Sequence, residues 1–221
     1  MKQQYFSATA KGGAAMFVGA ALMFLAGLLL IAVRADLLPP AGWLLWFMLT
    51  LGACYLGLMK LDEPPVQLSV DEQGVTYHHK RGDWLVRWQD MELVQQIEID
   101  GVAVAWIGFR LRDYDGLLAT LPLRLAVHLL MEQRSLLVAA MGANCPTGRC
   151  ASEFLSVDTE YRYKQRVLTG VLAMFTQRMV IFRQLLSVDL VVPAQLLDIT
   201  PHEFCREMNR LRLTFSKQYN G

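Results

Sequence analysis

Two uncharged stretches decide the fold: residues 12–33, GGAAMFVGAALMFLAGLLLIAV, and residues 37–59, LLPPAGWLLWFMLTLGACYLGLM. A helix of about 20 apolar residues spans the hydrocarbon core of a bilayer. The sequence therefore predicts a transmembrane hairpin of two helices over residues 12–60. A cleaved signal peptide is the alternative for the first stretch, because Lys2 and Lys11 precede it. Secretory apolar segments are shorter, about 7 to 15 residues, so we expect the first helix to be retained.

Basic residues beside the two stretches predict their orientation. Lys2 and Lys11 precede the first stretch, Arg34 stands between the two, and Lys60 follows the second. Because cytoplasmic flanks carry more Lys and Arg, we expect both termini in the cytoplasm, with residues 1–11 as a cytosolic tail. Neither stretch contains Asp, Glu, Lys, Arg or His, the residues that mark ion and proton pathways, so we expect an anchor and not a transporter.

Small residues recur in both stretches and predict close helix packing. Ala15, Gly19 and Gly27 lie in the first stretch, and Ala53 and Gly57 lie in the second. Small side chains let helix backbones approach one another. The pattern fits a hairpin that packs on itself and also a hairpin that packs on another protein.

The charges and cysteines of residues 61–221 indicate a cytosolic domain. This part contains 17 Lys and Arg against 19 Asp and Glu, a balance that argues against nucleic acid as a partner. Its three cysteines, Cys145, Cys150 and Cys205, cannot all pair within one chain, which is natural in a reducing compartment. We therefore expect a single cytosolic α+β domain.

Alternating apolar and polar residues begin after Pro64 and Pro65, which end the helical pattern. The predicted strands cover residues 66–70, 75–79, 84–88, 93–100 and 102–111. Short strands joined by turn sequences at hairpin spacing predict an antiparallel sheet or a small barrel.

Helical patterns dominate the remainder of the domain. Predicted helices cover residues 123–141, 163–186 and 201 onward, with a short strand at residues 189–192. Thr200, Pro201 and Glu203 form a capping box at the start of the last helix. Residues 66–141 are thus expected to form a sheet with one helix, and residues 151–221 a helical extension with a short strand.

The strand region resembles known families. Residues 66–118 are similar to the pleckstrin-homology-like domains of bacterial membrane proteins, in their opening strand, the turn at residues 71–77 (DEQGVTY) and the step at residues 88–91 (WQDM). The wider pattern, including residues 129–134 (LLMEQR) and 189–198 (DLVVPAQLLD), resembles a bacterial inner-membrane family catalogued as domain of unknown function 2982. The resemblances imply a PH-like sheet and a location in the bacterial inner membrane, and they imply no activity. Phosphoinositide binding is not expected, because Lys80 and Arg81 alone stand between the second and third strands.

One set of residues has the chemistry of a metal site. Cys145 and Cys150, together with His202 and Cys205, are four ligands of the types that bind tetrahedral zinc. The alternatives are that Cys205 is a small buried apolar residue, and that Cys145 and Cys150 are loop thiols or form a regulatory disulfide. We expect no cofactor, and we retain a metal- or thiol-dependent sensor or enzyme as the alternative function.

Two shorter motifs favour structural interpretations. His78 and His79 are adjacent on a predicted strand, so their side chains point to opposite faces and do not share one site. The segment 113–116 (DYDG) begins like a calcium loop but lacks the later ligands, so we expect a turn. Glycine-rich phosphate loops and nucleophile motifs are missing from the sequence, so we expect a protein without enzymatic activity.

A basic stretch interleaved with apolar residues has two interpretations. Its cations are Arg162, Lys164, Arg166, Arg178 and Arg183. A basic amphipathic helix near a membrane binds anionic headgroups, whereas a helix that is apolar on more than one face packs in a core. The predicted function is a non-enzymatic, membrane-tethered binding or scaffolding module, whose partners are the lipid bilayer and another membrane or cytosolic protein.

Overall fold

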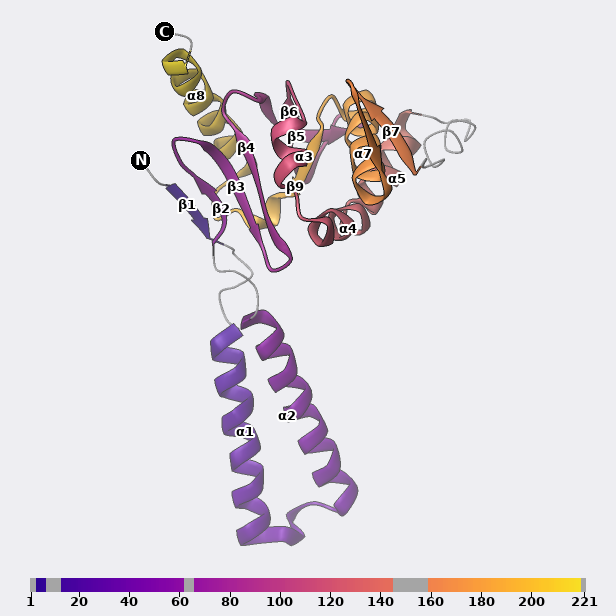
Figure 1. Cartoon of the computed structure of the whole chain (residues 1–221). Helices are drawn as coiled ribbons and strands as arrows, with labels where there is room; N and C mark the ends of the chain where they lie inside the picture. Colours follow the sequence, from indigo (N-terminus) through magenta and orange to yellow (C-terminus); the bar gives the residue numbers. More distant parts are fainter. Residues whose placement is uncertain (1–2, 7–12, 62–65, 145–158, 220–221) are drawn as a thin grey trace. The chain divides into compact units, whose positions relative to one another are not determined.

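The computed structural model describes residues 3–6, 13–61, 66–144 and 159–219. The chain divides into two compact units (Figure 1). The hairpin unit is formed by Ser7–Pro65, and the sheet domain is formed by Met1–Phe6 and Val66–Gly221.

The hairpin unit contains two long helices, as predicted. Helix α1 covers Gly13–Arg34, a short 3-10 turn covers Ala35–Leu37, and helix α2 covers Pro40–Leu61. Both helices are long and apolar enough to cross a membrane.

The two helices pack on each other through part of the predicted small-residue pattern. A Cβ atom at Gly57 would lie 2.9 Å from the Phe17 Cα, so glycine allows this close approach. Gly27 faces the Trp46 indole, whose Nε1 donates to the Met23 carbonyl at 3.3 Å. Ala15 and Gly19, by contrast, are exposed in the hairpin unit.

The sheet domain contains the five predicted strands, but they form two open sheets and no closed barrel. The first sheet has the order β1-β2-β3-β4, with strands Gln3–Phe6, Val66–Val70, Gly74–His79 and Gly82–Arg87. The second has the order β5-β6-β9, with strands Met91–Ile99, Val102–Leu111 and Leu190–Pro193. All pairs within both sheets are antiparallel.

The outer edge of β5 explains why the sheets do not close. Asn209 of helix α8, Pro201–Tyr219, accepts a hydrogen bond from the Val94 amide at 3.0 Å and donates to the Val94 carbonyl at 2.7 Å. Arg212 of the same helix donates to the Glu92 carbonyl. Side chains of α8 thus form hydrogen bonds with the backbone groups of β5 that another strand would bind. The sheet ends at β5, and the small barrel that the sequence allowed is not formed.

Strand β1 is an addition that the sequence did not predict. It lies within the expected tail of residues 1–11 and pairs with β2, with Gln3 opposite Val70 and Phe6 opposite Val66. A strand that precedes α1 therefore neighbours the strand that follows α2.

The helical elements differ from prediction in three places, the first of which is helix α3, an element that was not predicted. The remaining elements are α3 Asp115–Thr120, α4 Leu123–Glu132, α5 Arg134–Asn144, β7 Glu160–Tyr163, β8 Arg166–Thr169, α7 Gly170–Leu186 and the 3-10 turn Ala194–Leu196. The expected helix at residues 123–141 is divided into α4 and α5 at Gln133, whose buried side-chain amide donates to the Val191 carbonyl at 3.1 Å. The expected helix at residues 163–186 begins only at Gly170, because the β7–β8 hairpin precedes it.

The core lies between the sheets and helices α4, α7 and α8. It contains two clusters of apolar side chains, one around Trp84, Phe109 and Phe204 and the other around Ile97 and Phe182. Helix α7 contributes buried side chains that include Phe175, Met179 and Phe182. The apolar part of the predicted basic helix is therefore core, the second of its two interpretations. Helix α8 begins with the predicted capping box, in which Thr200 and Glu203 exchange hydrogen bonds.

Candidate functional site

One end of the first sheet is the point where both connections to the hairpin unit begin. Phe6, the last residue of β1, lies opposite Val66, the first residue of β2. The β3–β4 turn lies at the same end, because His79 pairs with Gly82 and stands two residues beyond the Leu68–Tyr77 pair. We call this end, with Phe6, Val66 and residues 79–82, the connection edge.

Helix α4 packs beside the connection edge (Figure 1). Gly82 has a φ of +125°, and a Cβ at this position would lie 2.6 Å from Pro122 Cγ, so glycine is required on both grounds. The His79 ring stacks on the ring of His128 in α4, with centroids 4.5 Å apart and an interplanar angle of 27°. These contacts fix α4 to the β3–β4 turn.

The outward side of α4 is apolar, as is its inward side. Leu125 and Leu129 point into the core, whereas Leu123, Val127 and Met131 are 55%, 43% and 69% exposed. Residues four apart lie on one side of a helix, so the three exposed side chains form one stripe. We call this stripe, with the exposed Arg124 beside it, the α4 face.

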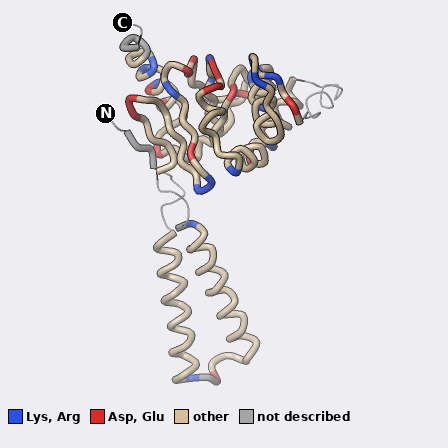
Figure 2. Tube along the Cα trace, in the orientation of Figure 1, with Lys and Arg blue, Asp and Glu red and all other residues tan. Residues whose placement is uncertain are grey.

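Basic residues lie at the connection edge and in the neighbouring helix α4 (Figure 2). Lys80 and Arg81 are exposed in the β3–β4 turn, and Arg124 is exposed on α4. The opposite end of the sheet carries Asp71 and Glu72 in the β2–β3 turn, drawn in red in Figure 2. The first sheet is thus basic at the end where the connections leave and acidic at the other.

The stacked histidines are kept neutral by this environment. Burial, the neighbouring His128, and then Arg81 and Lys80 lower the pKa of His79 to about 4, while Asp83 opposes the shift. Burial and the same two cations lower the pKa of His128. Burial also raises the pKa of Glu132, whose carboxylate lies 3.9 Å from His128 Nε2.

A chain of hydrogen bonds on the first sheet has the order serine, histidine, aspartate. Ser69 Oγ lies 2.8 Å from His78 Nε2, and His78 Nδ1 lies 2.9 Å from Asp83 Oδ2. Because a carboxylate only accepts, Nδ1 donates to Asp83, and in the neutral imidazole Nε2 accepts from the serine hydroxyl. His78 and His79 therefore have separate partners, as expected from their opposite orientations.

The surroundings of Ser69 differ from those of a catalytic serine. The residue is only 5% exposed. It lies in β2, which pairs with β1 on one side and β3 on the other. The backbone N–H groups of β2 are therefore used in hydrogen bonds to the neighbouring strands. Acyl transfer needs free N–H donors near the nucleophile to bind the oxyanion. We therefore interpret this chain as a cross-strand network that joins β2, β3 and β4.

Arg183, one of the predicted membrane-surface residues, is bound inside the sheet domain. Its Nε and Nη2 both donate to the buried Asp189 at 2.7 Å, and Nη2 also donates to the Leu111 carbonyl. Asp189 further accepts from the Tyr114 hydroxyl at 2.5 Å and the Leu111 amide at 2.7 Å. Burial and Asp189 raise the pKa of Tyr114, and the hydrogen bond to Asp189 raises that of Arg183. This network joins α7 to β6 and β9.

Lys164, a second predicted surface residue, binds the segment 113–116. Its Nζ donates to Asp113 at 2.6 Å and to Asp115 at 2.8 Å. The hydrogen bond from Lys164 is the main cause that lowers the pKa of Asp113 to about 2. Asp113 also accepts from the Asp115 amide at 3.0 Å. Asp113 and Tyr114 thus form a turn, as predicted, but Asp115 and Gly116 already belong to helix α3.

The other three predicted surface cations occupy different environments. Arg162 and Arg166 are exposed on the β7–β8 hairpin. The Arg178 guanidinium lies 5.9 Å from the centre of the Phe182 ring, and burial together with Arg134 lowers its pKa. The five cations therefore do not form one surface, and membrane contact by Arg162 and Arg166 stays a prediction.

The predicted metal ligands are described only in part. Cys145 and Cys150 lie outside the described residues. His202 is exposed on α8, whereas Cys205 is buried, and burial raises the pKa of its thiol to about 11. Within residues 3–6, 13–61, 66–144 and 159–219, His, Cys, Asp and Glu side chains form no group of three that could hold a metal ion.

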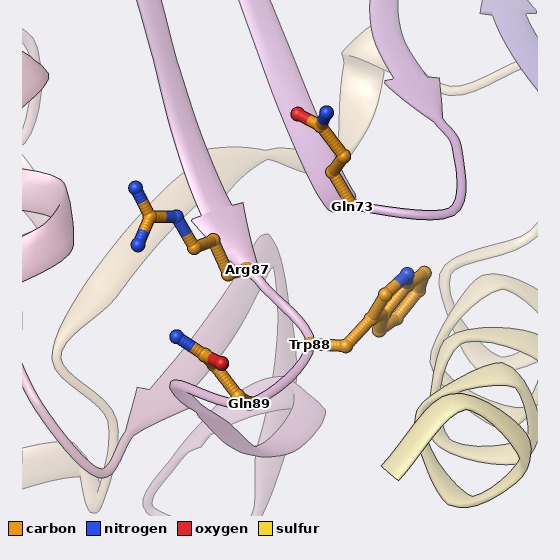
Figure 3. Close-up of a pocket in the computed structure, with 4 residues that line it drawn as sticks. All are labelled: Gln73, Arg87, Trp88 and Gln89. Atoms are coloured by element: carbon orange, nitrogen blue, oxygen red, sulfur yellow. The ribbon is translucent and has the colours of Figure 1, made fainter. Parts of the chain in front are cut away.

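A polar cavity of about 330 Å³ lies at the acidic end of the first sheet (Figure 3). Gln73, Arg87, Trp88 and Gln89 line it. Arg87 and Gln89 point to one side of the strand, and Trp88 points toward α8, where its ring stacks on Phe215 with centroids 5.5 Å apart. The Trp88 indole also donates to the Asp71 carbonyl at 2.8 Å, so this residue is part of the packing.

Comparison with known families identifies the sheet domain. A family model matches residues 68–213, from strand β2 into helix α8. The chain belongs to the family described as Protein of unknown function (DUF2982). The DUF2982 match includes α4, the β3–β4 turn and the Asp189 network, and it leaves out β1 and the hairpin unit. No curated protein and no solved structure matches the chain.

Proposed function

We propose that this protein is a membrane-tethered binding module without enzymatic activity, in which α1 and α2 cross the inner membrane and hold the sheet domain at its cytoplasmic surface. The pairing of β1 with β2 carries the proposal. These strands adjoin opposite ends of the hairpin unit in sequence, so both ends must emerge on one side of the bilayer. Two crossings satisfy this requirement and a single crossing does not.

The connections are short enough to keep the domain at the membrane. Five Cα-to-Cα steps separate Leu61 from Val66 and seven separate Phe6 from Gly13. Fully extended chains of these lengths reach at most about 18 Å and about 25 Å. A domain held this close meets a membrane partner at a high effective concentration, so modest contacts suffice for binding.

The polar groups of the sheet domain favour binding over catalysis. Asp189, Arg183 and Tyr114 satisfy one another, and Ser69 lacks the setting of a nucleophile. General acid–base or nucleophilic catalysis needs a reactive group in a cleft with a base beside it. The exposed α4 face, in contrast, is an apolar surface of the kind that marks interaction sites.

Membrane extraction of the full-length protein tests the tethering part of the proposal. The protein should stay in the membrane pellet after washing with alkaline carbonate and leave it only with detergent. Release by carbonate alone would contradict the proposal. Purification in mild detergent after cross-linking in intact membranes should then recover the module with its bound partner.

A further inference from the structure

We propose that the α4 face and the β3–β4 turn form a membrane-docking surface that binds the anionic lipid headgroups of the bilayer crossed by α1 and α2. The inference rests on the proposed function and names the partner of the tethered domain. Lys80, Arg81 and Arg124 provide the positive charges, and the three exposed apolar side chains of α4 insert into the membrane interface.

The place of this surface in the domain favours lipid as its occupant. Lys80 and Arg81 lie at the end of the first sheet where Phe6 and Val66 lead into the connections. The connection from Leu61 to Val66 reaches at most about 18 Å, so this end of the sheet stays near the bilayer surface. The acidic β2–β3 turn lies at the far end of the same strands, so an anionic surface attracts one end and repels the other.

The charges of the surface are available to an outside partner. Among the ion pairs of the described residues, none involves Lys80, Arg81 or Arg124. The cations of the β7–β8 hairpin differ, because Lys164 there is held by two aspartates. Exposed cations near an anionic leaflet each strengthen binding to it.

The apolar stripe suits the boundary between headgroups and acyl chains. Leu123, Val127 and Met131 are three of the seven large apolar side chains that are exposed in the described part of the sheet domain. An amphipathic helix with cations beside its apolar side lies in the plane of the membrane interface. Since the opposite side of α4 is buried in the core, docking removes the remaining apolar side from water while the fold is unchanged.

A fluorescent label on the α4 face tests the inference in the full-length protein. An environment-sensitive fluorophore is attached to Met131→Cys in a Cys145→Ser/Cys150→Ser background, and the background protein alone measures labelling of Cys54 and Cys205. The protein is reconstituted into vesicles of phosphatidylcholine, with or without about one-third phosphatidylglycerol. A label at Gln73→Cys, at the acidic end of the sheet, is the control.

Docking predicts that phosphatidylglycerol causes a blue shift of the Met131→Cys label and quenching by a lipid-borne quencher, with no change at Gln73→Cys. Lys80→Glu/Arg81→Glu should abolish both effects, whereas Arg162→Glu/Arg166→Glu, with the same change of charge, should leave them intact. About 0.5 M salt should also weaken them in the unsubstituted protein, which keeps the test independent of the folding of the variants.

Other results overturn the inference. A label that responds equally in both lipids indicates an apolar or protein contact, and loss of the response only in Arg162→Glu/Arg166→Glu places the contact on the β7–β8 hairpin. Carbonate extraction of each vesicle sample separates this failure from failure of the proposed function. An inserted protein without a lipid-dependent response contradicts docking alone, whereas a protein that does not insert contradicts both.

Discussion

The imidazole of His79 stacks on that of His128, with ring centroids 4.5 Å apart. This contact joins the end of β3 to α4 and places the α4 face beside Lys80 and Arg81. Protonation of the pair would put two cations in contact, next to two more. The geometry of the proposed docking surface therefore depends on the charge of these histidines.

Acidification should destabilise the domain through His79. Because the folded-state pKa of about 4 lies below the ordinary histidine value of 6.5, the unfolded chain binds more protons between these values. The stability due to neutral His79 is thus complete above pH 6.5 and is lost as pH falls toward 4. Thermal unfolding in detergent should show a Tm loss between pH 7 and pH 5 that is about 3 °C smaller in His79→Gln.

A control variant separates His79 from other groups that titrate. His202→Gln, an exposed histidine on α8, should keep the full pH dependence. Glu132 contributes a pH dependence of stability of opposite sign, because burial raises its pKa. Since the unsubstituted protein and His79→Gln both keep Glu132, the difference between their Tm losses is due to the histidine. An unchanged pH dependence in His79→Gln would contradict the assignment.

Removing the charge of Asp189 should be strongly destabilising. In Asp189→Asn one carboxylate oxygen is replaced by an NH2 group that faces donors, and the half-buried guanidinium loses its charged partner. The expected cost is about 2–3 kcal/mol in the free energy of unfolding. Asp100→Asn, at an exposed turn residue with a φ of +53°, should cost almost nothing, since asparagine tolerates this conformation. Equal stability of the two variants would show that the network is not needed.

Asn209 should prove necessary for the edge of β5. Asn209→Ala leaves the Val94 amide and carbonyl without their side-chain partners, at a cost of about 1–3 kcal/mol. It also opens a strand edge on which other chains can pair, so we expect a lower Tm and more aggregation on heating. Asn144→Ala, which removes a side-chain bond to the Ala140 carbonyl at the end of α5, is the matched control. A Tm equal to that of the control would refute this role.

The Ser69–His78–Asp83 chain should be chemically inert. A fluorophosphonate probe, which reacts with activated serines, should leave the full-length protein unlabelled. Labelling that disappears in Ser69→Ala would instead identify a hydrolase and overturn the proposed absence of enzymatic activity. The hydrogen-bond order alone does not decide this, because the reaction also needs an oxyanion site.

Local signals explain which elements the sequence predicts well. Both spans follow from the length of uncharged runs, and α8 follows from Thr200 and Glu203, which stand three residues apart and bond to each other. The sequence also indicates the DUF2982 family, which the family match confirms. For the spans and for α8, the deciding residues are close in the chain.

The elements that the sequence does not predict depend on distant residues. Strand β1 has four residues, and its partner β2 begins at Val66, beyond the whole hairpin. Gln133, which lies between α4 and α5, binds the distant carbonyl of Val191, and the β7–β8 hairpin is held through Lys164 by Asp113 and Asp115. The helical pattern of residues 123–141 or 163–186 does not indicate these contacts, because the partner residues lie outside it.

The proposed docking surface is not predicted by the sequence either, because it combines residues that are distant in the chain. Periodicity does indicate the side of α4 that faces the core, through Leu125 and Leu129, but it does not indicate what the apolar residues on the opposite side contact. Lys80 and Arg81 are a short basic pair in the sequence, and only the fold brings Arg124 to the same edge. The surface is therefore a product of tertiary packing.

Labelling of introduced cysteines with a membrane-impermeant thiol reagent tests the central claim most directly. Sealed vesicles are prepared from full-length Cys145→Ser/Cys150→Ser protein that carries Lys2→Cys, Asp36→Cys or Glu72→Cys. Two crossings by α1 and α2 predict that Lys2→Cys and Glu72→Cys react from the same side of the membrane and that Asp36→Cys reacts only from the other. Labelling of Lys2→Cys and Glu72→Cys from opposite sides, or of all three from one side, would contradict this topology.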